Sequence, residues 1–562
     1  MDEPPVHIEQ LNDGTHLIDF GRVAFGNVML HPPSETTGEL RLHFGEAMKD
    51  GCVDRKPPGT VRYKQTTITL AEAKPTLAAP KKDGRNTRID HPTTPPAILT
   101  PEEWGVILPF RWLEIEGWSG ELKPEHIVRK AAYSATWDDD AASFECSDEL
   151  LNRIWELCRY SIKATTFVGV YVDGDRERIP YEADAYLNQL SHYYTDNDIQ
   201  TARDTVAHLF KHPTWPTEWA PHMVFMVHAD WMHTGDKEWM AIYYEQLKEK
   251  TLAHRRGADG LIASSEQDIK RTDIVDWPKG ERDDYVFTSR NTVVNAFYLE
   301  AIRIMGELAK ALGKEDESRQ FQTDYKSSHA VFQSIFFDTD RQLYVDGIET
   351  DHSSAHANFF PLAFDLVPEN AREPISQWLA KRGMRCSVYA AQYLMEALFE
   401  NGAEAETLNM ITANNDRSWR HMLESGTTIT WEAWDQKYKP NQDWNHAWGA
   451  APANLLPRYI LGAEALQPGW KTVRIRPHLA GLSFAKGKVP TPRGPVHIEW
   501  GHSKSFKLTL NLPEATSAQV ELPTLEKNSK VYHNGQVADV QRIAERWVLM
   551  CESGGIHQFE VK

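Results

Sequence analysis

Residues 144–184, FECSDELLNRIWELCRYSIKATTFVGVYVDGDRERIPYEAD, mark the place where the sequence changes from a strand-like to a helix-like pattern. Apolar side chains recur there every three or four residues, which predicts a helix: Leu151, Ile154, Trp155, Cys158 and Ile162. Ser147 is suited to cap the first turn of this helix. An apolar run then leads into a charged loop, so we expect the carboxylates of the loop at the mouth of a helical core.

Helical patterns continue through the middle of the chain. One predicted helix carries Val294 and Phe297 and is expected to stop at Gly313. Other segments with helical spacing are residues 186–211, 222–253, 318–336, 370–382, 387–401, 403–413 and 446–461. So many antiparallel helices joined by loops predict an (α/α)6 barrel, and a long helical bundle is the alternative.

Strand-like segments flank the helical region. Short alternating runs, broken by Gly and Pro, occur at residues 16–30, 38–48 and 106–118 and again at 471–478, 496–503, 506–513, 517–523 and 546–553. Residues 74–96, rich in Pro, Lys and Thr, are expected to form a long surface loop. The predicted organisation is an N-terminal antiparallel β-sandwich in 1–138, the barrel in 139–465 and a C-terminal antiparallel β-sandwich in 466–562.

Composition excludes several classes of partner. The 562 residues carry a formal net charge of −19, which disfavours nucleic acid and anionic membranes. No run reaches the roughly 18 apolar residues of a membrane span. The five cysteines are scattered without metal-ligand spacing, so no metal site and no cofactor is expected.

Two further properties stay open at this point. The N-terminus lacks the pattern of a signal peptide, which fits either a cytoplasmic protein or one exported to the periplasm with its leader removed. For the oligomeric state, we expect a monomer or a homodimer.

The densest group of charged side chains lies at residues 171–184. Its carboxylates include Asp173, Glu177 and Asp184, and Arg176 is interleaved with them. Closely spaced carboxylates repel one another, so one of them can keep its proton near neutral pH and act as a general acid. A solvated surface of ion pairs is the alternative.

A second candidate segment, residues 426–449, is rich in tryptophan. The chain has 19 tryptophans, as many as tyrosines. Here Glu432 lies between two of them and His446 close to two more: Trp431, Trp434, Trp444 and Trp448. Flat apolar rings with an N–H donor suit the faces of sugars, and Glu432 is a candidate carboxylate base. A core cluster of tryptophans with a carboxylate at its rim is the alternative.

Two weaker segments also combine an acid with an aromatic ring. Glu218 precedes Trp219, and Asp276 precedes Trp277. Glycoside hydrolysis needs one protonated and one ionised carboxyl group, and the candidate segments supply both. The sequence contains no nucleophile elbow, phosphate-binding loop, zinc-protease motif or dinucleotide-binding motif that would indicate other chemistry.

On these residues the sequence resembles the α-L-rhamnosidases of glycoside hydrolase family 78. DFGRVAFGNVMLHPPSETTGELRLHFGEAMKDG and FRWLEIEGW are similar to the β-domain of that family, and FECSDELLNRIWELCRYSIKATT to the first helix of its barrel. DRERIPYEADA is similar to its acidic motif and SGTTITWEAW to its base motif. DWNHAWGA and PGWKTVRIRPHLAGL match the segments that follow the base.

The resemblance implies an inverting, exo-acting enzyme that removes terminal α-L-rhamnosyl residues from glycosides or from oligosaccharides derived from polysaccharides. It implies Glu177 as the general acid and Glu432 as the general base. The implied sugar-binding residues are Asp173, Arg176, Tyr181, Asp184, Trp219, Trp277, Trp434 and His446, with no metal.

The sequence departs from the family pattern at the sugar pocket. The spacing from Asp173 to Glu177 is shorter than usual, Tyr181 stands where the family has Trp, and Ala220 and Pro221 replace a Gly-Asp pair after Trp219. These differences leave the sugar and the leaving group open. They also leave open whether Glu182 or Glu218 takes the role of the acid.

Two alternatives in other classes remain. One is another exo-glycosidase, or a lyase specific for rhamnose and uronate, on the same helical toroid, with candidate groups Arg176, His222, His352 and His356. The other is a carbohydrate-binding relative without catalysis, which is expected to lack one of the two glutamates.

Overall fold

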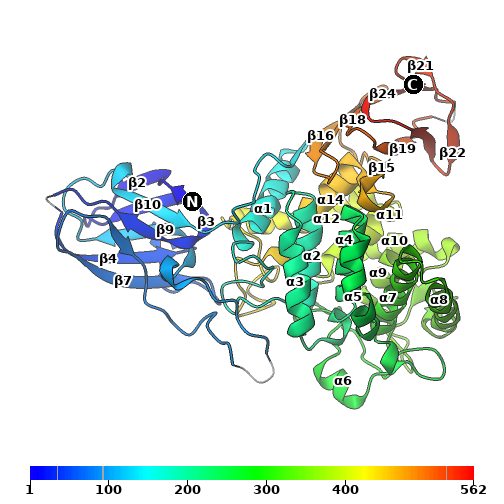
Figure 1. Cartoon of the computed structure of the whole chain (residues 1–562), viewed down its shortest axis with the longest axis horizontal. Helices are drawn as coiled ribbons and strands as arrows, with labels where there is room; N and C mark the ends of the chain where they lie inside the picture. Colours follow the sequence, from blue (N-terminus) through cyan, green and yellow to red (C-terminus); the bar gives the residue numbers. More distant parts are fainter. Residues whose placement is uncertain (35, 91–93, 527) are drawn as a thin grey trace.

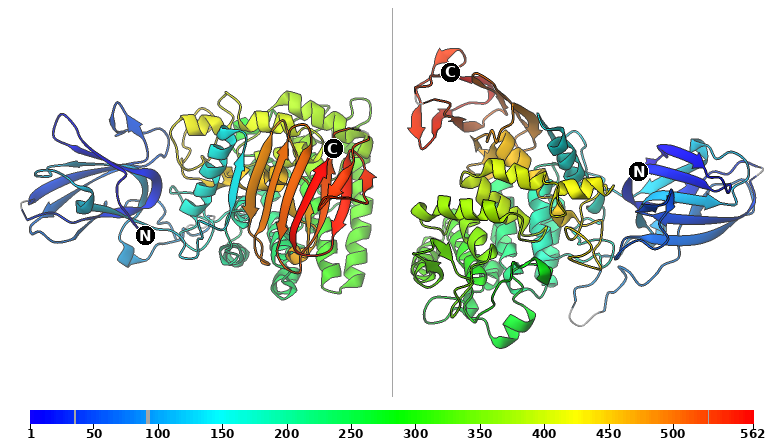
Figure 2. Two further views of the ribbon diagram at one scale, coloured as in Figure 1. Left: turned by 90° about the horizontal axis from the view of Figure 1, so that it is seen from above. Right: turned by 180° about the vertical axis from the view of Figure 1, so that it is seen from behind.

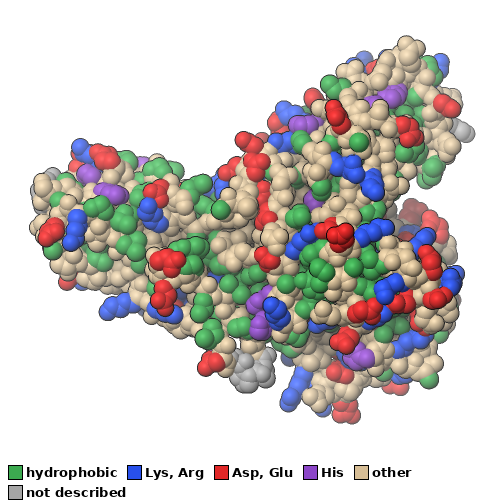
Figure 3. Space-filling model, viewed as in Figure 1, with side chains coloured by type: hydrophobic (Ala, Val, Ile, Leu, Met, Phe, Trp, Pro, Cys, Tyr) green, Lys and Arg blue, Asp and Glu red, His purple; other side chains and the backbone are tan. Residues whose placement is uncertain are grey.

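The computed structural model describes residues 1–34, 36–90, 94–526 and 528–562. A sheet domain comes first, a helical domain follows, and further sheets end the chain (Figure 1). The helical domain lies in the middle, and the two sheet regions project from it in different directions (Figure 2). The predicted order of β, α and β is confirmed. On the face drawn in Figure 3, acidic and basic side chains are interspersed.

The N-terminal sheet is built around one long strand, β3 (His16–Leu30), whose register shifts between Asp19 and Ala24. Within the described residues, the strands hydrogen-bonded into this sheet are β1 (Asp2–Glu3), β2 (His7–Gln10), β3, β4 (Gly38–Gly45), β7 (Tyr63–Leu70), β8 (Thr76–Ala78), β9 (Leu108–Glu116) and β10 (Ile127–Ala131). A small separate pair is formed by β5 (Met48–Lys49) and β6 (Cys52–Val53). The sheet has an apolar core of its own, which includes Leu42, Phe44 and Phe110.

The predicted strands of this region are therefore present, joined in one continuous sheet. Residues 74–96 were expected to be loop throughout, but they contain β8, which pairs with β3. Residues 91–93 of that segment lie outside the described part of the chain.

The helical domain begins with α1 (Glu149–Thr165). Its cap is Asp148 and not the predicted Ser147, because the Asp148 carboxylate accepts the backbone N–H of Leu150 at 2.9 Å. Residues 186–211 and 222–253, each predicted as one helix, are pairs: α2 (Glu182–Tyr193) with α3 (Gln200–Lys211), and α4 (His222–Thr234) with α5 (Lys237–Lys250). Gly235, with φ of 75°, ends α4, and Asp236 caps α5.

The remaining helices complete this domain. They are α6 (Glu266–Arg271), α7 (Thr292–Ala311), α8 (Glu315–Phe336), α9 (His356–Ala363), α10 (Glu369–Arg382), α11 (Ala391–Glu400), α12 (Glu404–Ile411), α13 (Trp419–Glu424) and α14 (Pro452–Leu455), which a π-helix (Leu456–Leu461) extends. Gly313 follows α7 with φ of 73°, which confirms the predicted stop. Of the helices in the described residues, none is long and apolar enough to cross a membrane.

The C-terminal region contains two sheets. In the described residues, one has the order β11 (Ser143–Cys146), β16 (Phe484–Val489), β17 (Val496–His502), β18 (Phe506–Leu512), β24 (Gly555–Val561), β20 (Val531–His533) and β21 (Gln536–Val537). The other has the order β14 (Ala463–Ala465), β15 (Thr472–Ile475), β19 (Ser517–Pro523), β23 (Arg546–Cys551) and β22 (Gln541–Ile543). Their buried side chains belong to the same apolar cluster as those of the helical domain.

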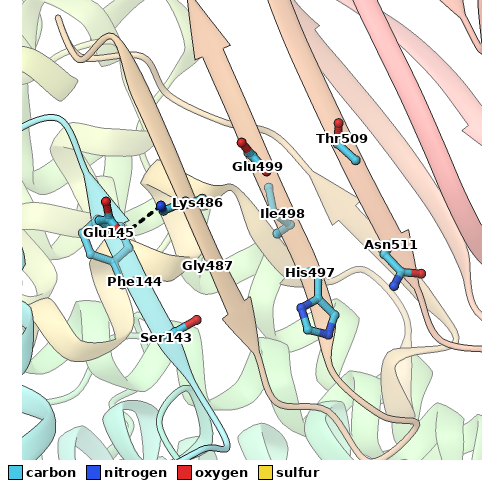
Figure 4. Close-up of a pocket in the computed structure, with 10 residues that line it drawn as sticks. All are labelled: Ser143, Phe144, Glu145, Lys486, Gly487, His497, Ile498, Glu499, Thr509 and Asn511. Atoms are coloured by element: carbon cyan, nitrogen blue, oxygen red, sulfur yellow. Dashed lines mark ion pairs between the residues drawn. The ribbon is translucent and has the colours of Figure 1, made fainter.

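Two strands cross the predicted domain boundaries. β11 comes before the first helix but pairs with β16, and Glu145 and Lys486 form an ion pair of 3.0 Å across this junction (Figure 4). β14, also placed with the helices by the sequence, pairs with β15. The outer face of the sheet at β11 carries a shallow polar hollow of about 360 Å³, which contains none of the predicted site residues.

Candidate active site

The charged loop between α1 and α2 is a tight turn fixed by its own backbone. The N–H of Asp173 donates to the carbonyl of Ile179 at 3.0 Å, and the N–H of Arg178 donates to the carbonyl of Gly174 at 3.0 Å. Arg178 adopts a left-handed φ of 56° to close the turn. Arg176 and Glu177 therefore stand at its tip.

The tryptophan-rich segment folds back on itself. The N–H of His446 donates to the carbonyl of Thr430 at 2.9 Å, and the N–H of Glu432 donates to the carbonyl of Asp443 at 3.1 Å. These bonds set Glu432 beside Asp443 and His446, although the three residues are not neighbours in the sequence.

The two loops meet directly. The side-chain oxygen of Asn445 accepts the N–H of Asp175 at 2.8 Å, and Asp443 accepts the N–H of Arg176 at 3.3 Å. A Cβ at Gly174 would lie 3.0 Å from oxygens of both Asn445 and Asp443, so glycine permits this approach. The structure thus brings the two predicted carboxylates, which come from distant segments of the chain, to one site.

Arg176 connects these two carboxylates. Its Nη1 and Nη2 donate to the two oxygens of Glu432 at 2.8 and 2.9 Å, and its Nη2 lies 3.8 Å from Oε2 of Glu177. The same nitrogen therefore contacts one carboxylate and faces the other. Both carboxylates therefore border one guanidinium.

Glu432 is buried and strongly ionised. Burial would raise its pKa, but the hydrogen bonds and charge of Arg176, together with His446 and Lys439, lower the pKa to about 2. The ammonium of Lys439 lies 3.0 Å from Glu432. Asp443 differs: burial raises its pKa to about 6, although the charge of Arg176 acts in the opposite direction.

Glu177 and Asp173 lie on the other side of Arg176. The Glu177 side chain is 39% exposed and accepts the hydroxyl of Tyr181 at 3.1 Å. Asp173 is buried, and burial together with the charge of Glu177 raises its pKa well above the usual range. One oxygen of Asp173 accepts the N–H of Ile179, whereas Oδ2 has no partner among the described residues. Such an orphaned acceptor is suited to a ligand hydroxyl.

His446 is paired with Asp184. Its Nε2 lies 2.7 Å from Oδ1 of Asp184. Burial lowers the pKa of His446, but the hydrogen bond and charge of Asp184, helped by Glu432, outweigh this effect and raise it. Its Nδ1 is buried and, in the part of the chain that is described, has no partner. Like Asp173, His446 therefore offers an unused polar atom.

Aromatic side chains extend the site beyond Tyr181. Trp219 meets the edge of Tyr181 at 5.7 Å and also contacts Tyr389 at 6.2 Å. Trp277 is half-buried and touches Trp215, which is exposed.

Trp434 lies elsewhere. It is fully buried, its Nε1 donates to the carbonyl of Cys386 at 2.8 Å, and its ring contacts Trp419 at 4.9 Å. Like Trp219, it belongs to the buried apolar core, and its indole N–H is already used.

Glu182 and Glu218, the other two candidate acids, accept hydrogen bonds from backbone N–H groups. Glu182 accepts the N–H of Thr214 at 2.9 Å as well as its hydroxyl. Glu218 accepts the N–H groups of Ile274 and Val275 at 3.0 and 2.8 Å, and burial raises its pKa to about 7. Both are occupied in fixing loops that lead to the site.

Three residues of the site were not identified from the sequence as functional. Lys439 and Asp443 lie within the tryptophan-rich segment, but their contacts with Glu432 depend on a loop without regular periodicity. Tyr389 stacks on Trp448 at 5.6 Å and had no signal in the sequence.

The site contains three side chains of the kinds that ligate metal ions, but the charges around them disfavour a metal ion. Ligand atoms of Glu432, Asp443 and His446 lie within 4.8 Å of one another. However, Arg176 and Lys439 already neutralise Glu432, and a third cation would be repelled. This donor set favours ion pairs over a metal ion.

Side chains of the N-terminal domain form ion pairs and hydrogen bonds with both loops, and these contacts brace the loops. Asp175 is fully buried and lies 2.9 Å from Nε of Arg62 and 3.4 Å from Nη1 of Arg85. Glu46 accepts the side-chain amide of Asn445 at 2.9 Å, and the hydroxyl of Thr60 donates to Asp443. The site is therefore shaped by two domains.

Three family models of bacterial α-L-rhamnosidases match the chain. The concanavalin-like domain matches residues 9–133, the six-hairpin glycosidase domain 139–460 and the C-terminal domain 462–536. An α-L-rhamnosidase of Formosa agariphila is 23% identical over 496 residues, which cover 81% of this chain and 52% of that protein. One of Alteromonas sp. is 23% identical over 563 residues, covering 92% and 57%. The chain spans about half the length of the curated relatives it matches.

Solved structures share the fold. The α-L-rhamnosidase of Dictyoglumus thermophilum superposes with a TM-score of 0.80 at 18% identity and covers 100% of this chain and 63% of that one. The Streptomyces avermitilis α-L-rhamnosidase complexed with L-rhamnose has a TM-score of 0.78 at 17% identity, covering 100% and 53%. Sheet, helical and sheet regions follow one another as in these proteins.

The brace from the N-terminal domain leads to a stability prediction. Replacing Arg62 with Met leaves Asp175 buried with one cation fewer, so we expect a loss of about 2–4 kcal/mol in the free energy of unfolding. The control is Arg41→Met, which breaks the exposed Arg41–Glu116 pair and should cost about 0–1 kcal/mol. Urea unfolding followed by tryptophan fluorescence measures both. Equal losses in the two variants would contradict the bracing role.

Proposed function

This chain belongs to the bacterial α-L-rhamnosidase family, and on that premise we propose that it is an exo-acting glycoside hydrolase that releases terminal α-L-rhamnosyl residues with inversion. Its substrates would be glycosides or oligosaccharides derived from polysaccharides. The observation that carries the proposal is the arrangement of Glu177 and Glu432 around Arg176, because glycoside hydrolysis depends on two carboxyl groups placed on either side of one bond.

Glu432 acts as the base in this proposal. Its low pKa keeps it ionised at every working pH, and an ionised carboxylate is what the activation of water requires. Glu177 acts as the acid: it is the more exposed of the two, so it can reach the oxygen of a leaving group that extends toward solvent. Tyr181 fixes its carboxyl through the hydroxyl.

The sugar is held by the groups that have unused polar atoms. We assign Oδ2 of Asp173 and Nδ1 of His446 to its hydroxyls, with Asp184 keeping the imidazole in place. Trp219, Trp277 and Tyr181 supply apolar surface, and Arg176 keeps Glu432 charged. Trp434 supports the site from the core, since its ring has no exposed surface.

The finer description of the fold belongs to the same proposal. The helices would form an (α/α)6 barrel between two β-sandwiches, with domains at 1–138, 139–465 and 466–562. The strands β11 and β14 add residues 143–146 and 463–465 to the C-terminal unit. The partner is carbohydrate, and the active species is a monomer or a homodimer.

The roles of the two carboxylates can be tested with an aryl α-L-rhamnoside. We expect Glu177→Gln and Glu432→Gln each to lower kcat by roughly 10²–10⁴-fold with an unchanged circular dichroism spectrum, since each variant loses one proton-transfer group. The control is Glu182→Gln, whose carboxylate faces Thr214, and it should keep kcat within about tenfold. A loss in the control as large as that in Glu177→Gln would transfer the acid role to Glu182.

Inversion makes a separate prediction about the product. Water activated by Glu432 attacks the face opposite to the leaving group, so an α-linked substrate should yield the β-anomer first. Proton NMR during the first minutes of the reaction, before mutarotation, distinguishes the two anomers. Initial formation of the α-anomer would mean retention and would assign Glu432 the role of nucleophile.

The electrostatic role of Arg176 predicts a change in pH dependence. With the pKa of Glu432 at about 2, kcat/KM of the unaltered chain should not fall on account of this group above about pH 3. Without the guanidinium the pKa of Glu432 rises, so Arg176→Gln should move the acid limb of kcat/KM upward by about 1–3 pH units. Lys437→Gln, which removes an exposed cation from the same segment, should leave the limb in place. An unmoved limb in Arg176→Gln would overturn this role.

A further inference from the structure

Three side chains of the kind that ligate transition metals come together in the C-terminal sheets, away from the catalytic loops. His533 ends β20, Cys551 ends β23, and His557 lies in β24. One ligand atom from each lies within 4.8 Å of the other two. Nothing in the sequence indicated this cluster, because the three residues are on separate strands and show no metal-ligand spacing.

Hydrogen bonds prepare one imidazole as a ligand. Nε2 of His557 lies 3.0 Å from the carbonyl of Ser553, which accepts only, so the ring proton must reside on Nε2. The lone pair of Nδ1 then points toward Nε2 of His533, 3.0 Å away. A carbonyl that fixes the tautomer of a histidine in this way is a common support of metal sites.

Two of the three ligands are buried, and the third is held by a stacking contact. Cys551 and His557 are 3% and 8% exposed. The ring of Phe559 stacks on His533 at 4.6 Å and 10° and fixes the plane of the imidazole. β23 belongs to the five-stranded sheet and β20 and β24 to the seven-stranded sheet, so a shared ion would join the two sheets of the described region.

The donor atoms select the class of ion. Two imidazole nitrogens and one sulfur suit Zn²⁺ and similar ions, whereas Ca²⁺ and Mg²⁺ require oxygen ligands. Among the described residues, neither imidazole forms an ion pair, in contrast to Glu432 at the catalytic site.

We propose that His533, Cys551 and His557 bind a zinc-class divalent ion through Nε2, Sγ and Nδ1, with water in the fourth position. Tetrahedral ligands at about 2.0–2.3 Å place two nitrogens about 3.3 Å apart, so a small rotation of the rings is sufficient. On binding, the proton of His533 moves from Nε2 to Nδ1, and the thiol of Cys551 loses its proton to solvent. The site tethers the two sheets and takes no part in glycoside hydrolysis.

The experiment uses the full chain after treatment with a chelator, and Co²⁺ as the probe. One equivalent of Co²⁺ should produce the charge-transfer absorption of a cobalt–thiolate bond, Zn²⁺ should displace it, and Zn²⁺ should raise the thermal midpoint. Cys551→Ser should abolish the absorption. His533→Ala, at the partly exposed ligand, should weaken Co²⁺ binding at least about tenfold. The control is Cys52→Ser at an exposed cysteine, which should bind Co²⁺ as the unaltered chain does.

Three results would overturn the proposal. They are no thiolate absorption at saturating Co²⁺, absorption that survives Cys551→Ser, and absorption that disappears in Cys52→Ser. Hydrolysis of the aryl rhamnoside separates this site from the catalytic one, because it should be equal with and without Zn²⁺. If hydrolysis requires the ion, the metal acts at the catalytic carboxylates and the tether is refuted.

Discussion

The loops that carry Glu177 and Glu432 have no regular secondary structure of their own, so their shape depends on buried acceptors for backbone N–H groups. Asn445 and Asp443 accept the N–H groups of Asp175 and Arg176, where a strand or helix would have used carbonyl oxygens. A buried carboxylate costs several kcal/mol unless it is paired. The pairing of Asp175 with Arg62 and Arg85 offsets this cost and makes the turn at Gly174 stable.

The two flanking regions contact the helical domain to different extents. The C-terminal sheets share its apolar core: Trp500, for example, is buried there and donates to the carbonyl of Ile460 at 2.7 Å. The N-terminal sheet has a separate core and meets the site through charged and polar groups such as Glu46 and Arg62. The N-terminal sheet also makes smaller apolar contacts with the helical domain, such as the stacking of Phe25 on Phe167 at 4.6 Å.

What could be predicted from the sequence followed from local patterns. Alternation placed β3, and helical spacing placed α1 and α7. The density of acids and tryptophans singled out Glu177 and Glu432, which the structure brings to one arginine, Arg176. The features that could not be predicted depend on contacts between segments far apart in the sequence, or on which of two similar residues forms a contact. β11 pairs with β16, and the whole helical domain separates these two strands in the sequence. Ser147 and Asp148 are both suitable caps for α1, and the sequence alone does not decide between them. Tyr389 reaches the site only because the helices close around it.

The position of Arg176 determines the charge and the accessibility of Glu432. Each oxygen of Glu432 accepts a hydrogen bond from Arg176, so the base is ionised but also occupied, and water must compete for the same oxygens. A shift of the guanidinium toward Glu177, 3.8 Å away, would free oxygens of Glu432 to accept a hydrogen bond from water. Movement of the guanidinium away from Glu432 would raise the pKa of this carboxylate and make it a stronger base. Under the proposed function, at least one of these two hydrogen bonds has to give way to water before Glu432 can act as a base.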